Sequence, residues 1–117
     1  MAKFTVDRLT WYRGKESYQS KLLLEDGKRC CIGFVGQQCQ VPDEFMQGAA
    51  EINSLENDLQ DAFPEWMTDG RRTPDGNISE ISKAYNVNDD NTIGDAEREA
   101  SLKAIFERNG DEIEFTN

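Results

Sequence analysis

Apolar residues in this chain fall into short clusters, and the spacing inside the clusters changes along the sequence. At both ends, from Lys3 to Asp7 and from Glu112 to Phe115, they alternate with polar residues, which predicts two strands with one buried face each. Between residues 49 and 108 they recur every three or four positions, which is typical of amphipathic helices. The pattern therefore predicts an α+β fold.

The first of these helices is expected from Ala49 to Phe63, because Pro64 cannot continue it. A second is expected to follow a cap at Asn77, after an exposed loop at residues 68–77 that holds two Asp-Gly pairs. Trp66 and Met67 are expected to pack immediately after the first helix. The inward-facing residues of the pair are predicted to be Ile52, Leu55, Leu59, Phe63, Ile78, Ile81 and Tyr85.

The last helix has the most regular pattern in the chain. A polar loop at residues 86–95 ends in Asp95, which is expected to cap a helix that continues to Asn109. Gly110 then stands where a left-handed C-terminal cap is expected. Leu102, Ile105 and Phe106 are predicted to face the core. On the solvent face, acidic and basic residues are expected to pair with one another: Glu97, Glu99 and Glu107 with Arg98, Lys103 and Arg108.

The first third of the chain admits two interpretations. The run LLLE at residues 22–25 meets the turn signal Asp26-Gly27, so a β-hairpin with the following KRCCIGFV is one of them. The apolar positions from Cys31 onward fit a helix better, and we favour a helix from about Cys30 to Gln40 with LLLE kept as a strand. Gly33 and Gly36 would each weaken such a helix by up to about 1 kcal/mol relative to Ala, so they are expected to serve close packing.

These elements predict a single globular domain over residues 1–117. Its sheet is expected to be small, antiparallel or mixed, with about three strands covered by two or three helices. A chain of 117 residues is long enough to close one core without disulfides or metal.

Charge excludes several classes of function. The chain has 23 Asp and Glu against 13 Lys and Arg and no His, a formal net charge of −10. A nucleic-acid binder needs a basic surface, so direct binding of DNA or RNA is disfavoured, as is docking on an anionic membrane. A strongly negative protein favours association with a basic protein surface, including one that otherwise binds nucleic acid. The alternative is that the charge only keeps the protein in solution.

Several sequence features that would indicate a membrane, a secreted protein or a cofactor are absent. No stretch approaches the roughly 18 apolar residues of a membrane span, and the N-terminal residues do not resemble a signal peptide. Three cysteines within ten residues, Cys30, Cys31 and Cys39, do not suggest a secreted disulfide framework. A cytoplasmic location is expected, and no cofactor is predicted.

The sequence contains few combinations of residues that are typical of catalytic sites. Without His, the Ser-His-Asp and Cys-His arrangements cannot form, and the glycine-rich nucleotide-binding loops do not occur. Cys30 and Cys31 are candidate reactive thiols, because Lys28 and Arg29 and a helix N-terminus would lower the pKa of a thiol there. The alternative is that they are small apolar residues packed in a core.

Metal sites also fit poorly. Three thiols do not supply the four ligands of structural zinc. The loop that starts at Asp89 resembles a calcium loop through Asn91 and Gly94, but Ile93 and Ala100 occupy two ligand positions. A solvated turn explains it better.

We predict that two clusters of residues bind a partner. Trp11, Tyr12 and Arg13 combine the residue types that dominate protein interfaces. The second cluster is Asp89, Asp90 and Asp95. The alternative for Trp11 and Tyr12 is packing over the edge of the core.

Three segments carry a resemblance: WYRG near the start, DGKRCCIGF, and the C-terminal stretch NVNDD followed by DAEREASLKAIFERNGDEIEF. Together they resemble a family of small uncharacterised bacteriophage and prophage proteins with a Cys-Cys-Leu-Gly-like motif. The matching residues are Cys30, Cys31, Gly33, Asn88, Asp89, Arg98, Glu99, Ala100, Phe106, Gly110 and Phe115, with Ile32 where leucine is commoner. The resemblance covers about half the chain, implies no catalytic role, and does not extend to residues 40–82.

The function expected from these observations is that of a phage accessory protein. It would bind a host protein through an acidic surface and inhibit a defence or nucleic-acid-processing factor by occupancy, as a nucleic-acid mimic does. One alternative is a small cysteine-dependent or metal-assisted enzyme. Another is a self-associating accessory protein of the phage particle. The sequence does not indicate an oligomeric state.

Overall fold

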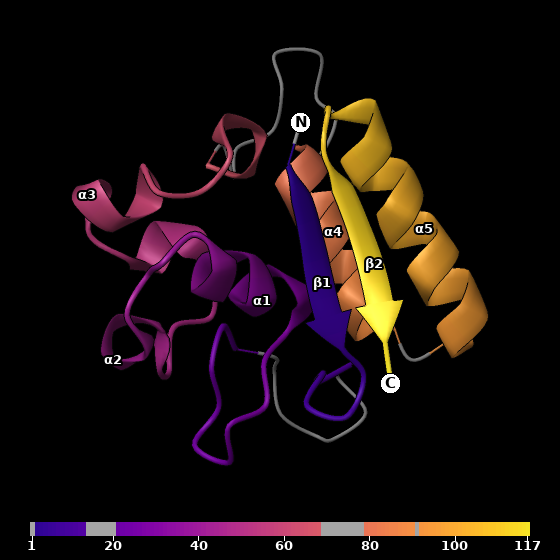
Figure 1. Cartoon of the computed structure of the whole chain (residues 1–117), viewed down its shortest axis with the longest axis horizontal. Helices are drawn as coiled ribbons and strands as arrows, with labels where there is room; N and C mark the ends of the chain where they lie inside the picture. The colour runs from indigo at the N-terminus through magenta and orange to yellow at the C-terminus, as the bar shows by residue number, and fades with distance from the viewer. Residues whose placement is uncertain (1, 14–20, 69–78, 91) are drawn as a thin grey trace.

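A computed structural model describes residues 2–13, 21–68, 79–90 and 92–117. Two strands and two long helices lie on one side of the molecule, and the shorter helices lie on the other (Figure 1). In chain order the elements are β1 (Lys3–Asp7), α1 (Cys31–Gln38), α2 (Asp43–Met46), the 3-10 turn η1 (Ile52–Ser54), α3 (Asn57–Gln60), the 3-10 turn η2 (Glu65–Met67), α4 (Glu80–Asp89), α5 (Asp95–Arg108) and β2 (Glu112–Thr116).

The sheet joins the two ends of the chain. β1 and β2 pair in parallel, with Phe4 opposite Ile113 and Val6 opposite Phe115. These four side chains are buried, while the alternate positions of both strands are exposed or half-exposed, as the period of two predicts. The expected strands at residues 3–7 and 112–115 are therefore confirmed.

The prediction of about three antiparallel or mixed strands is wrong, because the described residues form a sheet of two parallel strands. The run LLLE makes only an isolated bridge, Leu23 with Gln47. Its backbone bonds to the segment after α2, where Leu22 N–H donates to Ala49 C=O and Gly48 N–H donates to Leu23 C=O. The expected turn is present, since Gly27 has φ +89°, but no ladder extends from it.

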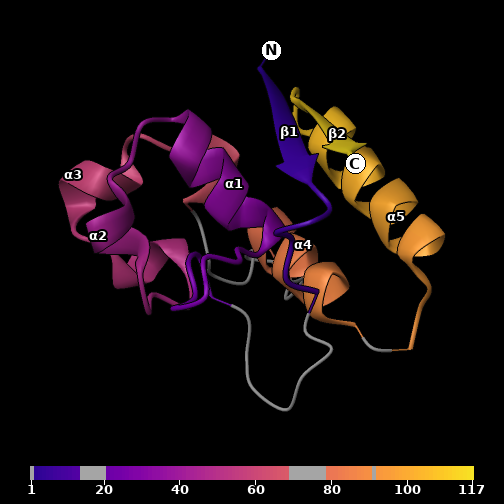
Figure 2. The same cartoon turned by 60° about the horizontal axis from the view of Figure 1, so that its bottom comes forward.

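The helix favoured over a hairpin is present as α1, slightly shorter than predicted. Its first six residues are buried, so α1 is the central element of the core (Figure 2). Gly33 makes this position possible, because a Cβ there would lie 2.0 Å from the Leu22 carbonyl oxygen. The expected role of Gly33 in close packing is confirmed.

The single helix predicted from Ala49 to Phe63 is wrong. Only η1 and α3 form there, and Leu55 between them is extended with ψ 161°. Asn, Ser and Asp at residues 53, 54, 57 and 58 are weak helix formers that favour turns. Ile52, Leu55 and Phe63 are nevertheless buried as predicted, because each short piece turns one apolar side chain inward. Met67 packs after them, also as predicted.

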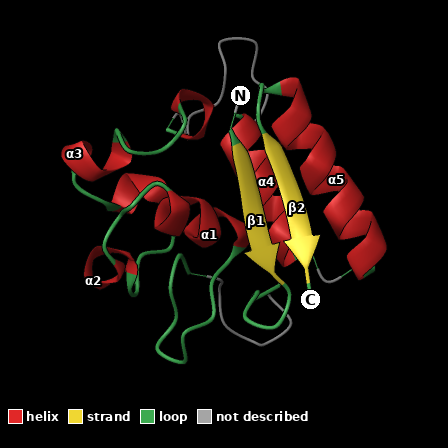
Figure 3. Cartoon of the chain, viewed as in Figure 1, coloured by secondary structure: helices red, strands yellow, loops and turns green. Residues whose placement is uncertain are grey.

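The two long helices confirm their predicted buried faces but correct their ends. Ser79, whose hydroxyl accepts from Ser82 N–H, is the N-cap of α4, whereas Asn77, Ile78 and the loop from residue 69 lie outside the described residues. α4 continues to Asp89 through four residues predicted to be loop. Gly94 is the N-cap of α5, and Asp95 is its first residue. Figure 3 shows α4 and α5 as the long helices beside the two strands. Gly110 has φ +89°, as the left-handed cap requires.

Candidate functional site

Like that of Arg98, the side chain of Asn88, near the end of α4, is only 1% exposed. Its Oδ1 accepts from the indole Nε1 of Trp11 at 2.7 Å and from the backbone N–H of Cys31 at 3.0 Å. Its Nδ2 donates to the Tyr12 carbonyl oxygen at 3.0 Å. Asn88 thus joins the segment after β1, the start of α1 and the end of α4 through one side chain.

The six predicted contact residues lie around this amide and the neighbouring Arg98. Trp11 and Tyr12 are buried, each 4% exposed, so the alternative of packing at the core edge is the observed one. The Trp11 ring lies 4.8 Å from the Phe115 ring, and the guanidinium of Arg13 covers it at 4.4 Å from its centroid. Arg13 Nη1 also lies 3.6 Å from Asp95 Oδ2.

Arg98 binds two of the three remaining members of the set, Asp90 and Asp95, and Asn88 binds the third. Arg98 is 1% exposed, donates Nη1 to Asp95 Oδ1 at 2.7 Å, and bonds through Nη2 to the Asp90 carbonyl. Asn88 Nδ2 donates to Asp89 Oδ1 at 2.9 Å. Folding therefore gathers all six predicted residues, but their polar groups bond to other parts of the same chain.

The predicted pairing along the solvent face of α5 is wrong. Arg98 is in the core, and Glu99 pairs with Arg8, which donates Nε and Nη2 at 2.9 and 2.7 Å. Arg108 pairs with Glu80 of α4 through both carboxylate oxygens, and these bonds lower the pKa of Glu80 to about 2. Glu80 and Glu99 therefore tie elements together across the fold, while Glu80 with Lys83 and Asp95 with Arg98 also form pairs within one helix.

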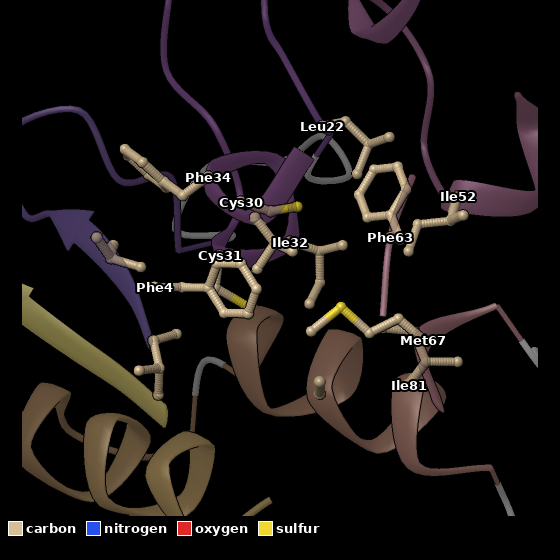
Figure 4. Close-up of a cluster of buried hydrophobic side chains, with 14 of the residues drawn as sticks. Phe4, Leu22, Cys30, Cys31, Ile32, Phe34, Ile52, Phe63, Met67 and Ile81 are labelled. Carbon is tan, nitrogen blue, oxygen red and sulfur yellow. The ribbon is translucent and has the colours of Figure 1, made fainter. Parts of the chain in front are cut away.

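Cys30 and Cys31 lie among apolar side chains of the core (Figure 4). Burial raises the pKa of the Cys30 thiol to about 12 and raises that of Cys31 well above its ordinary value. A reactive thiol needs access and a lowered pKa. The structure gives these two cysteines neither, and it fits the alternative of apolar core residues. Cys39 is half-buried.

A small hollow of about 100 Å³ lies beside Cys30, between α4 and the segment before η1. It is lined by Cys30, Ala50, Glu51, Tyr85, Asn86, Asn88 and Asp89. Among the described residues, no group of three or more Cys, Asp and Glu side chains is placed to hold a metal ion.

A different set of charges lies in the stretch that contains α2 and α3, which are on the far side of the molecule from β2 and α5 (Figure 1), and ends at Glu65, near Asn109 and Asp111. The chain has no Lys or Arg between Arg29 and Arg71, although this stretch is rich in Asp and Glu. We call residues 43–65 the acidic segment. It contains α2, η1 and α3, and it carries seven exposed acidic residues: Asp43, Glu44, Glu51, Glu56, Asp58, Asp61 and Glu65.

Only one member of the acidic segment has a cationic partner within the described part of the chain. Asp43 Oδ1 accepts from Arg29 Nη2 at 2.8 Å, and no ion pair joins the other six to any described residue. The ring of Phe45, 48% exposed, lies on α2 beside Asp43 and Glu44. The absence of basic residues around these acids is visible in the sequence. Their common location required the fold.

Two further findings concern the whole chain. Within the described ranges, no helix is long and apolar enough to cross a membrane. Comparison with known proteins gives no match, whether to a family model, a curated protein or a solved structure.

Proposed function

We propose that this chain binds a protein with a basic surface through its acidic segment and blocks that surface by occupancy. The observation that carries the proposal is the set of six exposed carboxylates without a described cationic partner, on a stretch that contains no Lys or Arg. The phage-like sequence segments suggest a bacterial host protein as the partner. A defence or nucleic-acid-processing factor is the class whose function needs such a basic surface.

The physical basis is electrostatic complementarity. Unpaired surface charges of one sign attract a partner of the other sign and accelerate its association. Carboxylates already bonded to Arg or Lys contribute less, because their field is compensated nearby. In the acidic segment this compensation is nearly absent, because six of its seven exposed carboxylates have no described ion pair and the stretch contains no Lys or Arg.

Exposed Phe45 adds an apolar contact to the same surface. Interfaces concentrate binding energy in a few aromatic or Arg anchors surrounded by polar groups. An aromatic ring among carboxylates is suited to an Arg-rich surface, because Arg side chains stack on aromatic faces and pair with carboxylates.

The experiment uses two variants with the same charge change. One carries Glu44→Gln, Glu51→Gln and Glu56→Gln in the acidic segment. Its control carries Glu97→Gln, Glu107→Gln and Glu112→Gln, which are exposed and also form no ion pair with a described residue. Each protein is immobilised, exposed to a nuclease-treated bacterial lysate at low ionic strength, and washed with increasing salt.

The wild type and the control variant are expected to retain the same host protein, and the acidic-segment variant to lose it. Increasing salt should release the retained host protein, since the Debye length falls from about 30 Å to about 10 Å between 0.01 M and 0.1 M ionic strength. The proposal is overturned if nothing is retained at low salt, or if both variants retain equal amounts.

A further inference from the structure

The edge of β1 that faces away from β2 is bonded at one position by a side chain, that of Gln38, instead of by a neighbouring strand. Gln38, at the end of α1, accepts from Thr5 N–H through Oε1 at 2.9 Å and donates Nε2 to the Thr5 carbonyl at 2.7 Å. These two bonds are the pair that a neighbouring strand would make. They also show that Thr5 points its backbone groups away from β2.

Residues two apart in a strand point their backbone groups to the same side. The N–H and C=O of Lys3 therefore face the same free edge as those of Thr5, and no hydrogen bond joins them to another described group. On the opposite side, Ala2 C=O accepts from Glu112 N–H of β2 and Arg8 N–H donates to Thr116 C=O, which confirms the alternation.

A groove runs beside this edge, between β1 and the segment that follows α3. It is a hollow of about 590 Å³ lined by Ala2, Lys3, Phe4, Gln38, Cys39, Ala62, Phe63, Pro64 and Asp111. A second hollow continues it past Pro64 and Asp111 towards Trp66 and Asn109. The groove thus combines unpaired backbone groups at Lys3 with an apolar wall from Ala62 to Pro64.

We propose that an extended basic segment of the partner adds to the edge of β1 as a third strand and displaces the side chain of Gln38. This inference rests on the proposed function for the charge of the partner. Strand addition obtains affinity from main-chain hydrogen bonds and specificity from pockets for alternate side chains. Here the incoming strand bonds to Lys3 and Thr5, and its apolar side chains contact the wall of the groove.

Charge selects a basic occupant. Glu65 lines the second hollow, and Asp61 directly precedes the apolar wall in the chain; both are exposed and have no ion pair with a described residue. Lys3 is the cation among the lining residues, and its ammonium is already paired with Glu114 at 2.9 Å. An acidic incoming strand would add negative charge beside these unpaired carboxylates, whereas a strand with alternating Lys or Arg would pair with them.

The variant Lys3→Pro tests the edge directly. Proline removes the Lys3 N–H, which faces the groove and takes no part in the pairing with β2. The matched control is Lys3→Ala, which loses the same charge and keeps the N–H. Circular dichroism and thermal unfolding establish that both variants are folded.

The probe is a short synthetic peptide of alternating lysine and valine, with a glutamate-valine peptide as its control. Two readouts are used: a binding titration, and the rate at which iodoacetamide alkylates Cys39, which lines the groove and is the half-buried cysteine of the three. The lysine peptide is expected to slow alkylation of the wild type and of Lys3→Ala. Lys3→Pro should bind it about tenfold more weakly, the scale of one lost hydrogen bond.

Gln38→Ala supplies a test in the opposite direction. Without a competing side chain at Thr5, the peptide should bind this variant several-fold more tightly than the wild type. The inference is overturned if the lysine peptide does not protect Cys39, if Lys3→Pro and Lys3→Ala bind equally, or if Gln38→Ala binds more weakly. The lysate experiment with the Glu44, Glu51 and Glu56 variant decides the proposed function separately, because those residues do not line the groove.

Discussion

The two sides of this molecule use acidic residues in different ways. On the side formed by β1, β2, α4 and α5, which we call the paired half, several carboxylates bond to Arg or Lys of another turn or element, as Glu80 does with Arg108 and Glu99 with Arg8, although Glu97, Glu107 and Glu112 form no described ion pair. Across the molecule, the acidic segment makes one ion pair among the described residues, between Asp43 and Arg29. The same residue types therefore hold the fold together on one side and remain exposed on the other.

This difference teaches how a net charge should be interpreted. A total of −10 does not by itself distinguish solubility from recognition. What matters is the fraction of acids whose charge is compensated within the fold. The acidic segment contains no Lys or Arg, and only Asp43 in it has a described ion pair, so its charge is largely uncompensated and a cationic partner is expected there.

The largest effect that tests the comparison is expected at Asn88. If polar groups of the paired half are structural, Asn88→Ala should destabilise strongly, because it leaves Trp11 Nε1, Cys31 N–H and the Tyr12 carbonyl without their partner. A loss of about 3 kcal/mol in the free energy of unfolding is expected. Urea denaturation followed by tryptophan fluorescence measures it.

The control is Asn86→Ala, two residues earlier on the same helix and exposed. It should change the free energy of unfolding by less than about 0.5 kcal/mol. Equal losses for the two variants would mean that Asn88 is not a structural centre, and the distinction between the two sides would lose its main support.

Local patterns in the sequence predicted the elements whose residues contact one face of the core. The strands at residues 3–7 and 112–115 and the buried face of α5 follow from periodicity alone. The helix at α1 was predictable because its apolar positions fit a helical spacing better than a period of two. Gly33 was also expected to serve close packing, and a Cβ there would lie 2.0 Å from the Leu22 carbonyl oxygen.

Other features depend on contacts that no local pattern encodes. Apolar spacing in residues 49–63 matched a helix, but Tyr85 of α4 accepts a hydrogen bond from Ile52 N–H, and the backbone turns around each buried residue. The sequence places Arg98 on a charged helix and Asn88 in a polar loop, whereas both are buried. The partners of Asn88 are Trp11, Tyr12 and Cys31, far away in the chain, so its role could not be predicted from neighbouring residues. Arg98 binds residues close to it in the chain, Asp90 and Asp95, but the apolar spacing of its helix did not indicate that it is buried.

A smaller effect is expected from the pairing of Glu80. Bonds from Arg108 hold the pKa of this carboxyl at about 2, below its ordinary value of 4.5. Since the folded pKa is the lower one, the stabilisation is complete above pH 4.5 and disappears as the pH falls towards 2. The pair is partly exposed, so its contribution is about 1 kcal/mol at most.

Comparison of the wild type with Glu80→Gln in acid denaturation measures this contribution. The difference in free energy of unfolding should be constant above pH 5 and shrink steadily below the ordinary value of 4.5. A difference that does not depend on pH would mean that the carboxylate charge is not what Arg108 binds, and the paired half would owe less to its ion pairs than the geometry indicates.

The smallest effect is expected in the acidic segment, where the comparison is sharpest. Removing three charges with Glu44→Gln, Glu51→Gln and Glu56→Gln breaks no described ion pair, so the free energy of unfolding should change by no more than about 0.5 kcal/mol. By contrast, Glu99→Gln removes one charge and with it the two-point pairing to Arg8, at a cost of up to about 1 kcal/mol. Thermal unfolding of the two variants in one buffer decides the matter. If three substitutions in the acidic segment cost more than one in the paired half, those carboxylates contribute to folding, and their exposure can no longer be assigned to a partner.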